Sequence, residues 1–255
     1  MRPVCSMLVL TAAVACAACS GANVERAPAP VAADVEPSVA PRIVRRGNEP
    51  PSVAVGRGAL CSFTLAMTDG GPPAPPDAAR TVATVRAKCA AERAAVESSF
   101  SFPTDADVDM IRGASFLADL DFDGFLDIAL LREFGASWAT FEVRRYDAPS
   151  QRYLADAFTV EVGALPNLVV DEAARRLLSY DISPSTPREL IYRVDRGHLV
   201  AEEMCAIDEV GTFVHTLAGK VVETRPAPSD GARMPCLQRH VALEEVDRPS
   251  PFTAP

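Results

Sequence analysis

The feature that most constrains the fold of this chain is a succession of short apolar runs, each closed by turn-forming residues. The clearest runs are Ala59–Met67, Thr81–Cys89, Ala95–Phe102, Ala139–Tyr146, Leu154–Val162, Leu177–Ile182, Glu189–Asp195, His198–Met204, Thr212–Leu217 and Lys220–Thr224. The tripeptide Asp195-Arg196-Gly197 and the dipeptide Ala218-Gly219 are typical of hairpin turns. Runs of this length predict an all-β fold of antiparallel strands, arranged as a meander, a sandwich or a propeller.

The first residues have the pattern of an export signal. One arginine precedes the apolar run Met7–Ala15, which is shorter than the roughly 20 residues that a membrane-spanning helix needs. Residues 1–18 are therefore predicted to be a signal peptide that is removed. Cys16 and Cys19 both end lipobox-like sequences, and Cys19 is favoured for lipidation because Ser-Gly follows it.

The lipobox predicts an exported protein that is lipid-anchored in the cell envelope, and the serine behind the lipid favours the outer membrane, facing the periplasm. An ordinary signal peptide with incidental cysteines is the alternative. Residues 19–56 are rich in Ala, Pro and Val and are predicted to form a disordered tether. Residues 241–255 are predicted to form a disordered tail, which leaves 57–240 as one β domain.

Four cysteines lie beyond the signal: Cys61, Cys89, Cys205 and Cys236. An even number in an exported chain predicts two disulfides. Three connectivities are possible, and the local pairs Cys61–Cys89 and Cys205–Cys236 are favoured. Free, buried thiols are the alternative.

One motif carries recognisable chemistry, the segment FLADLDFDGFLDIALL at residues 116–131. Four aspartates stand at the first, third, fifth and ninth positions of a loop inside it: Asp119, Asp121, Asp123 and Asp127. The chain must turn sharply at Gly124, and the carbonyl of Phe125 can add a further oxygen. Calcium takes six to eight oxygen ligands, so the loop 119–127 is predicted to bind calcium. A solvated acidic hairpin is the alternative.

The loop differs from those of EF-hands and dockerins, which need an acidic ligand at the twelfth position, where Leu130 stands. The residues after the loop are strand-like and do not start an amphipathic helix. The pattern resembles the strand–loop–strand calcium site of FG-GAP repeats, as in integrin-type propellers. There the fourth carboxylate comes at the ninth position, which is that of Asp127.

The segments after the loop extend this resemblance: Trp138–Tyr146, Tyr153-Leu154, Leu165-Pro166-Asn167, Leu177–Tyr180 and Ile191–Val200. Their order is similar to that of periplasmic proteins in which a "DxNFDGxxD" loop precedes strands ending in "Y-x-x-x-x-G-x-L". That family includes invertebrate-type lysozyme inhibitors and immunity lipoproteins against secreted peptidoglycan hydrolases. The resemblance, over residues 80–225, implies a small β-propeller-like fold, a calcium loop and inhibition through an inserted loop. It assigns no residue of this chain to the inhibitory contact.

The leading hypothesis is a calcium-stabilised, non-enzymatic envelope lipoprotein that binds another protein and inhibits a peptidoglycan hydrolase. An FG-GAP or integrin-like adhesion or assembly module is the alternative. An enzyme is less favoured, because the chain has no G-x-S-x-G or H-E-x-x-H motif and its histidines, His198, His215 and His240, are scattered. The formal net charge of −9 disfavours a nucleic-acid partner.

Overall fold

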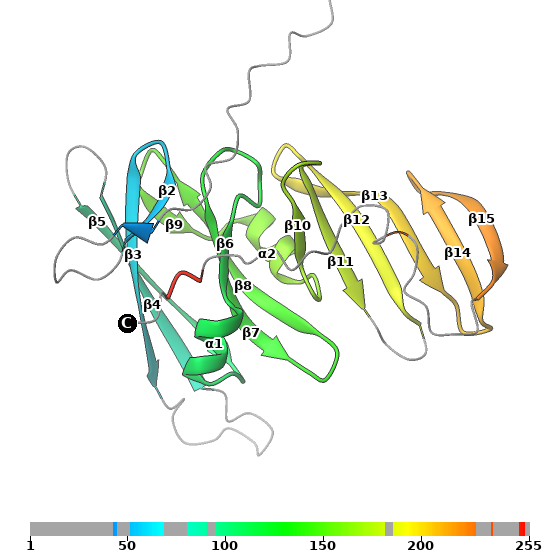
Figure 1. Cartoon of the computed structure of the whole chain (residues 1–255), viewed down its shortest axis with the longest axis horizontal. Helices are drawn as coiled ribbons and strands as arrows, with labels where there is room; N and C mark the ends of the chain where they lie inside the picture. The colour runs from blue at the N-terminus through cyan, green and yellow to red at the C-terminus, as the bar shows by residue number, and fades with distance from the viewer. Residues whose placement is uncertain are drawn as a thin grey trace, which may run out of the picture. The chain divides into compact units, whose positions relative to one another are not determined.

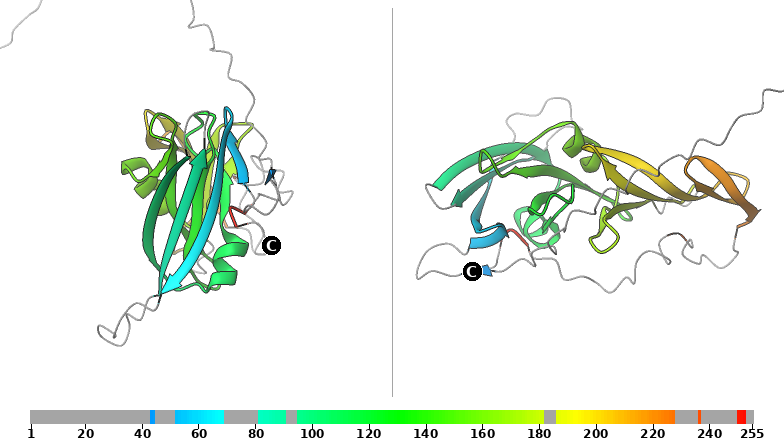
Figure 2. Two further views of the ribbon diagram at one scale, coloured as in Figure 1. Left: turned by 90° about the vertical axis from the view of Figure 1, so that its left-hand side faces the viewer. Right: turned by 90° about the horizontal axis from the view of Figure 1, so that it is seen from above.

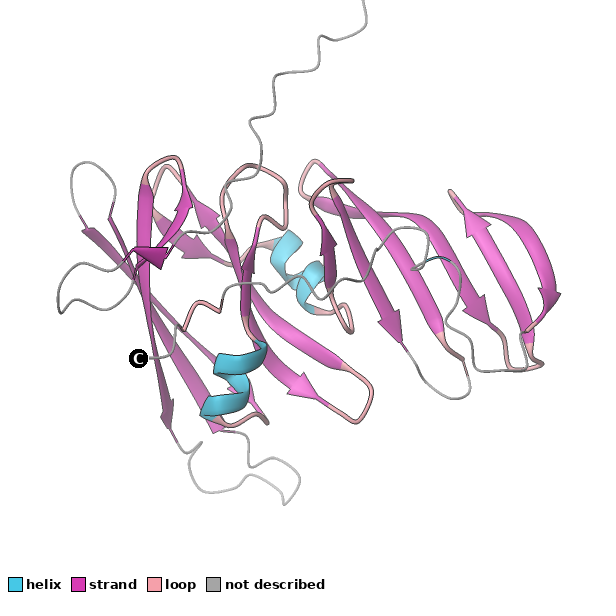
Figure 3. Cartoon of the chain, in the orientation of Figure 1, coloured by secondary structure: helices cyan, strands magenta, loops and turns pink. Residues whose placement is uncertain are grey.

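The computed structural model describes residues 43–44, 52–68, 81–90, 95–181, 186–227, 236 and 250–252, which all belong to one compact unit, Glu36–Pro255. Strands dominate in three sheets, and every strand pairing is antiparallel (Figure 1, Figure 3). The predicted antiparallel all-β fold is thereby confirmed. The signal peptide 1–18 and Cys19 lie outside the described residues.

The first sheet has five strands in chain order: β1 (Ile43–Val44), β2 (Ser52–Gly56), β3 (Ala59–Thr68), β4 (Thr81–Ala90) and β5 (Ala95–Thr104). Successive side chains of a strand point to opposite faces of the sheet. Along β4 the buried face therefore takes alternate residues, from Ala83 through Val85 and Ala87 to Cys89.

Strand β2 corrects the predicted tether of residues 19–56. Ser52–Gly56 pair with β3, and the side chains of Val53 and Val55 are buried in the core. The alternation of Val53 and Val55 is the sequence signal for this strand, but the prolines just before it favoured a tether. The rest of the predicted tether lies outside the described residues, except for β1.

The second sheet has four strands: β6 (Phe116–Ala118), β7 (Asp127–Phe134), β8 (Ala139–Asp147) and β9 (Arg152–Leu154). The first five residues of β7 are all buried, so β7 is covered on both faces. Strand β5 contacts β7 and β9, and β4 contacts β9. The left view of Figure 2 shows the first sheet in front of the second. The helix α1 (Val108–Ala114) contacts β3 and β7.

The helix α2 (Ala157–Gly163) stands where the sequence predicted a strand, Leu154–Val162. The reason is a capping box at Asp156, whose side chain accepts from the Thr159 amide at 3.0 Å while the Thr159 hydroxyl accepts from the Asp156 amide at 2.9 Å. This local pairing outweighs the low helix propensity of the β-branched residues that follow.

The third sheet has six strands: β10 (Val169–Asp171), β11 (Arg176–Asp181), β12 (Arg188–Asp195), β13 (His198–Ile207), β14 (Thr212–Leu217) and β15 (Lys220–Pro226). The two predicted hairpin turns are confirmed. Arg196 and Gly197 have φ of 53° and 75°, and Ala218 and Gly219 have φ of 46° and 76°. Two successive positive φ values are the geometry of the turns that match the twist of a hairpin.

The buried side chains of the described residues form two clusters. The larger cluster joins the first two sheets, both helices and the near strands β10 and β11 of the third sheet. The smaller cluster has five members: Leu178, Ile191, Cys205, Phe213 and Cys236. The propeller-like arrangement stays a prediction, since the described strands form three separate sheets.

The predicted disordered tail of residues 241–255 has a packed piece, residues 250–252. The Ser250 hydroxyl donates to the carbonyl of Arg112 at 2.6 Å, and Phe252 is buried in the larger cluster. The other tail residues lie outside the described part of the chain. Among the described residues, helices long and apolar enough to span a membrane are absent.

Candidate metal centre

The predicted calcium loop joins β6 to β7 and folds its backbone around the side chain of Asp119. The two oxygens of Asp119 accept from the amides of Asp123 at 3.0 Å and Gly124 at 2.9 Å. The turn places Phe122 at a φ of 61° and Gly124 at a φ of 90°. Glycine adopts such a φ without steric cost, which explains its place in the motif.

Neighbouring segments hold the loop from outside. The Leu126 amide donates to the Val55 carbonyl of β2 at 2.8 Å. Gly56 lies so close to the loop that an added Cβ would stand 2.7 Å from the Gly124 carbonyl oxygen. The Arg175 guanidinium donates to the Phe122 carbonyl at 2.6 Å. The loop is therefore built into the core and is anchored by β2 and by Arg175, which are both far away in sequence.

Asp127 is the most buried carboxylate of the loop, with no exposed surface. Its two oxygens accept from the Leu120 amide at 3.0 Å and from the Tyr146 amide of β8 at 2.9 Å. Burial raises the pKa of Asp127 well above its usual value, and the negative charge of Asp121 adds to the rise. Asp127 thus ties both ends of the loop to the neighbouring strand.

Three of the four predicted carboxylates converge. One oxygen from each of Asp119, Asp121 and Asp127 lies within 4.8 Å of the other two. Asp123 is exposed and stands outside that group, and its Oδ1 accepts from the Phe125 amide at 2.9 Å. The carbonyl of Phe125 stays a predicted ligand.

The carboxylates of the loop are electrostatically strained. Burial raises the pKa of Asp119 to about 6, against the lowering effect of the hydrogen bond from Gly124, and the charges of Asp123 and Asp121 raise it further. Desolvation of its carboxylate and the charge of Asp121 raise the pKa of Asp123 to about 6 as well. A bound cation would favour the charged forms and remove this strain.

Arg145 of β8 is the residue of this site that sequence reasoning missed. Its guanidinium forms ion pairs with Asp121 at 3.0 Å and with Asp156, the N-cap of α2, at 2.9 Å. Only the register of β8 against β7 and the loop brings Arg145 to Asp121, and a single sequence carries no signal for that register.

The donor set fits a hard divalent cation. Asp119, Asp121 and Asp127 supply only oxygens, and Asp123 and the Phe125 carbonyl stand next to them in the chain. Calcium prefers such a set and tolerates irregular geometry. When bound, the ion would cross-link β6, β7 and the loop between them. Asp119 and Asp127, which would hold it, also fix the backbone of the loop by accepting hydrogen bonds from its amides.

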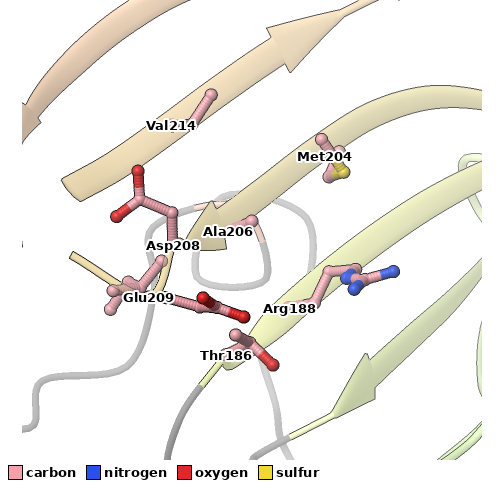
Figure 4. A pocket seen from close by; sticks show the side chains of 8 residues that line it. Thr186, Arg188, Met204, Ala206, Asp208, Glu209 and Val214 are labelled. Atoms are coloured by element: carbon pink, nitrogen blue, oxygen red, sulfur yellow. The ribbon is translucent and has the colours of Figure 1, made fainter. Parts of the chain in front are cut away.

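Both favoured disulfides are present, Cys61–Cys89 and Cys205–Cys236. A small open pocket of about 270 Å³ lies elsewhere, on the third sheet (Figure 4). Met204 and Val214 form part of its apolar wall, and Arg188 and Asp208 line it as well. The predicted metal ligands are not among the residues that line this pocket.

Comparisons with known proteins do not place the chain in a family. No family model matches it, and no curated protein matches it. Among solved structures, the structure of a Xanthomonas Type IV Secretion System related protein is similar, with a TM-score of 0.42 and 12% identity over 72% of this chain and 98% of that chain. A likeness of this size assigns neither family nor function.

Proposed function

We propose that this chain is a calcium-stabilised envelope lipoprotein that acts without catalysis, by binding another protein. Its partner is a peptidoglycan hydrolase, which it inhibits in the manner of a lysozyme inhibitor or an immunity protein. The observation that carries the proposal is the convergence of Asp119, Asp121 and Asp127 in a loop anchored to the core. Lipid anchoring through Cys19, the outer-membrane location and the propeller-like arrangement belong to the same proposal.

The chemistry of the loop supports a structural role for its carboxylates. Asp119 and Asp127 each accept two backbone hydrogen bonds, which commits their oxygens to the shape of the loop. A general acid or base must be free to exchange a proton with a substrate. Carboxylates that hold backbone amides and a cation are better suited to stiffening a scaffold than to catalysis.

A surface suited to a protein partner lies at the hairpin between β7 and β8. Phe134 and Trp138 flank the turn and are 38% and 39% exposed. The Trp138 indole packs so closely on Gly135 that the glycine has no room for a Cβ, and the Gly135 amide donates to the Trp138 carbonyl at 2.7 Å. A rigid, exposed tryptophan is the kind of side chain that dominates protein interfaces.

The alternative is an adhesion or assembly module, and the FG-GAP-like spacing of the loop favours it. The two functions differ in their readout. An inhibitor stops the turnover of its target at a one-to-one ratio, whereas an adhesion module binds its partner without reducing any turnover.

The test is a titration of the purified chain, with and without calcium, against a panel of peptidoglycan hydrolases that includes those of its own organism. We expect one hydrolase to lose its activity at stoichiometric protein. The variant Trp138→Ala should weaken inhibition at least tenfold, that is by about 1.4 kcal/mol or more. Val210→Ala is the matched control, because Val210 is 84% exposed and lies on another hairpin.

Two outcomes would count against the proposal. Full activity of every hydrolase, with calcium binding intact, would reject the inhibitor and leave the adhesion module. Turnover of peptidoglycan, esters or phosphoesters by the chain itself, lost in Asp119→Asn or His215→Gln, would show an enzyme.

A further inference from the structure

A second group of metal-competent side chains lies on the third sheet, far in sequence from the aspartate loop. Glu203, Cys205, His215 and Cys236 are all buried, and one ligand atom from each lies within 4.8 Å of the other three. Glu203 and Cys205 alternate on β13, and Cys205 lies directly across from His215 of β14. The antiparallel pairing therefore brings one carboxylate, one imidazole and the Cys205 sulfur to the same face of the sheet, and the disulfide adds the sulfur of Cys236.

Glu203 is the centre of this group. Its Oε1 stands 2.8 Å from His215 Nε2 and 3.3 Å from Cys236 Sγ. In the disulfide, Cys236 sulfur has no hydrogen to donate to that carboxylate oxygen. Ligand atoms of a tetrahedral zinc site stand about 3.3–3.8 Å apart, given Zn–S near 2.3 Å and Zn–N or Zn–O near 2.1 Å. The distance between Glu203 Oε1 and Cys236 Sγ already falls in that range, and the distance between Glu203 Oε1 and His215 Nε2 is shorter and must widen when a metal binds.

We propose that these four residues form a zinc site once the Cys205–Cys236 disulfide is reduced, so that the chain has a disulfide state and a metal state at one place. A dithiol breaks the S–S bond by exchange, passes two electrons and two protons to the cysteines, and becomes a disulfide itself. Zinc then displaces the two thiol protons to solvent, and two thiolates, a neutral His215 nitrogen and the Glu203 carboxylate complete a four-ligand set.

The other disulfide shows why this inference is specific to one pair. Cys61 and Cys89 are also buried and lie directly opposite each other, on β3 and β4. Their outer cross-strand neighbours are Val53 and Val96, which offer no ligand atoms. Reduction there would leave two thiols among apolar side chains, so this pair is the matched control within the same molecule.

The experiment uses the purified chain, reduced with dithiothreitol, freed of it by gel filtration under nitrogen, and titrated with Zn²⁺ or Co²⁺ alone. Cobalt reports thiolate ligation by a charge-transfer absorption that the aspartate loop cannot produce. We expect one thiolate-bound metal per chain in the wild type and in Cys61→Ala/Cys89→Ala, and none in Cys205→Ala/Cys236→Ala. His215→Gln should weaken zinc binding at least about tenfold.

Thermal unfolding of the reduced protein separates a folded site from capture of zinc by loose thiols. A metal that binds the folded state raises the melting temperature with its concentration, so zinc should raise it in Cys61→Ala/Cys89→Ala. Three results would overturn the proposal: no thiolate–cobalt absorption in that variant, an unchanged zinc affinity in His215→Gln, or a melting temperature that zinc does not raise.

Discussion

The two disulfides of this protein lie in parts of the fold that are held together by different means. Across the first sheet, the row of facing residues that contains one disulfide reads Val53, Cys61, Cys89 and Val96. Across the third sheet, the corresponding row reads Glu189, Cys205, His215 and Glu223. Val53, Cys61 and Cys89 of the first row belong to the larger apolar cluster, whereas Cys205 belongs to the cluster of five residues.

The difference shows how much a crosslink contributes in each region. Around Cys61 and Cys89 the strands are already joined by a long ladder and by a large buried core. Around Cys205 few apolar side chains are buried, and Cys236 reaches the sheet from beyond its last strand. Apolar burial supplies most of the stability of a domain, so the second region depends more on its crosslink and on its polar contacts.

The largest expected effect comes from removing each disulfide. The bonded cysteines are 28 and 31 residues apart, so the chain-entropy model gives both about 3.6 kcal/mol. Cys61→Ala/Cys89→Ala should lower the free energy of unfolding of the whole domain. Cys205→Ala/Cys236→Ala should instead lower amide protection mainly in β13–β15, because that region has the smaller core. Hydrogen exchange measures both, and equal, uniform losses would contradict the comparison.

The next effect concerns Asp127, the buried polar link within the larger core. Asp127→Ala leaves the Leu120 and Tyr146 amides without their acceptor, which should cost about 3 kcal/mol at about 1–3 kcal/mol for each unsatisfied buried donor. Asp127→Asn keeps one acceptor oxygen and should cost less. Denaturant unfolding in a chelator gives both values, and a loss below about 1 kcal/mol for the alanine variant would show that the loop is not integral to this core.

The pH dependence of stability distinguishes the empty loop from the calcium-bound loop. Burial raises the pKa of Asp119 from 3.8 to about 6, so between about pH 4 and pH 6 the folded chain keeps a proton that the unfolded chain has lost. Without calcium, this carboxyl should therefore lower the free energy of unfolding by about 2 kcal/mol as the pH rises through that range.

Asp119→Asn is the reference for that prediction, since it removes the titrating group and keeps an acceptor. The free energy of unfolding of the wild type minus that of the variant should fall with rising pH in a chelator. In saturating calcium it should rise instead, because calcium competes with protons for the carboxylates. A difference in free energy of unfolding that does not change with pH would contradict the raised pKa of Asp119. Calcium should not change the hydrogen-exchange protection of β13–β15, which lie in the other region.

The smallest expected effect belongs to Arg145, whose guanidinium shares Asp121 with the predicted cation site. Arg145→Gln should cost less than about 1 kcal/mol in a chelator, because the side chain is partly exposed and water screens its ion pairs. The same change should strengthen calcium binding about two- to fivefold, since a positive charge beside the site is removed. Arg193→Gln, which removes an exposed ion pair on the third sheet, is the control. Weaker calcium binding in Arg145→Gln would refute the idea that Arg145 and calcium compete for Asp121.

Much of the fold could be predicted because its signals are local. The strand runs and the hairpin turns at Arg196-Gly197 and Ala218-Gly219 follow from patterns that a few neighbouring residues carry. The two disulfides follow from the even number of cysteines and from the preference for pairs that are near in sequence. The aspartate spacing predicted four converging carboxylates, because a tight loop turns alternate side chains inward, and three of the four approach one another. Asp123, the most exposed of the four, does not join the other three carboxylates, so there the local pattern predicted more than the structure shows.

The remaining features depend on partners that are distant in sequence. Ser52–Gly56 become a strand because β3 and the loop cover them. The helix Ala157–Gly163 is the exception, because its signal, the Asp156–Thr159 capping box, is local and was outweighed in the prediction by a strand-like composition. The sequence alone determined the antiparallel strands, the turns and the acidic loop, since their periods and turn residues act within a few positions. Tertiary structure alone decided that Arg145 reaches Asp121 and that His215 and Glu203 reach Cys236, because strand register is set by burial across the whole sheet.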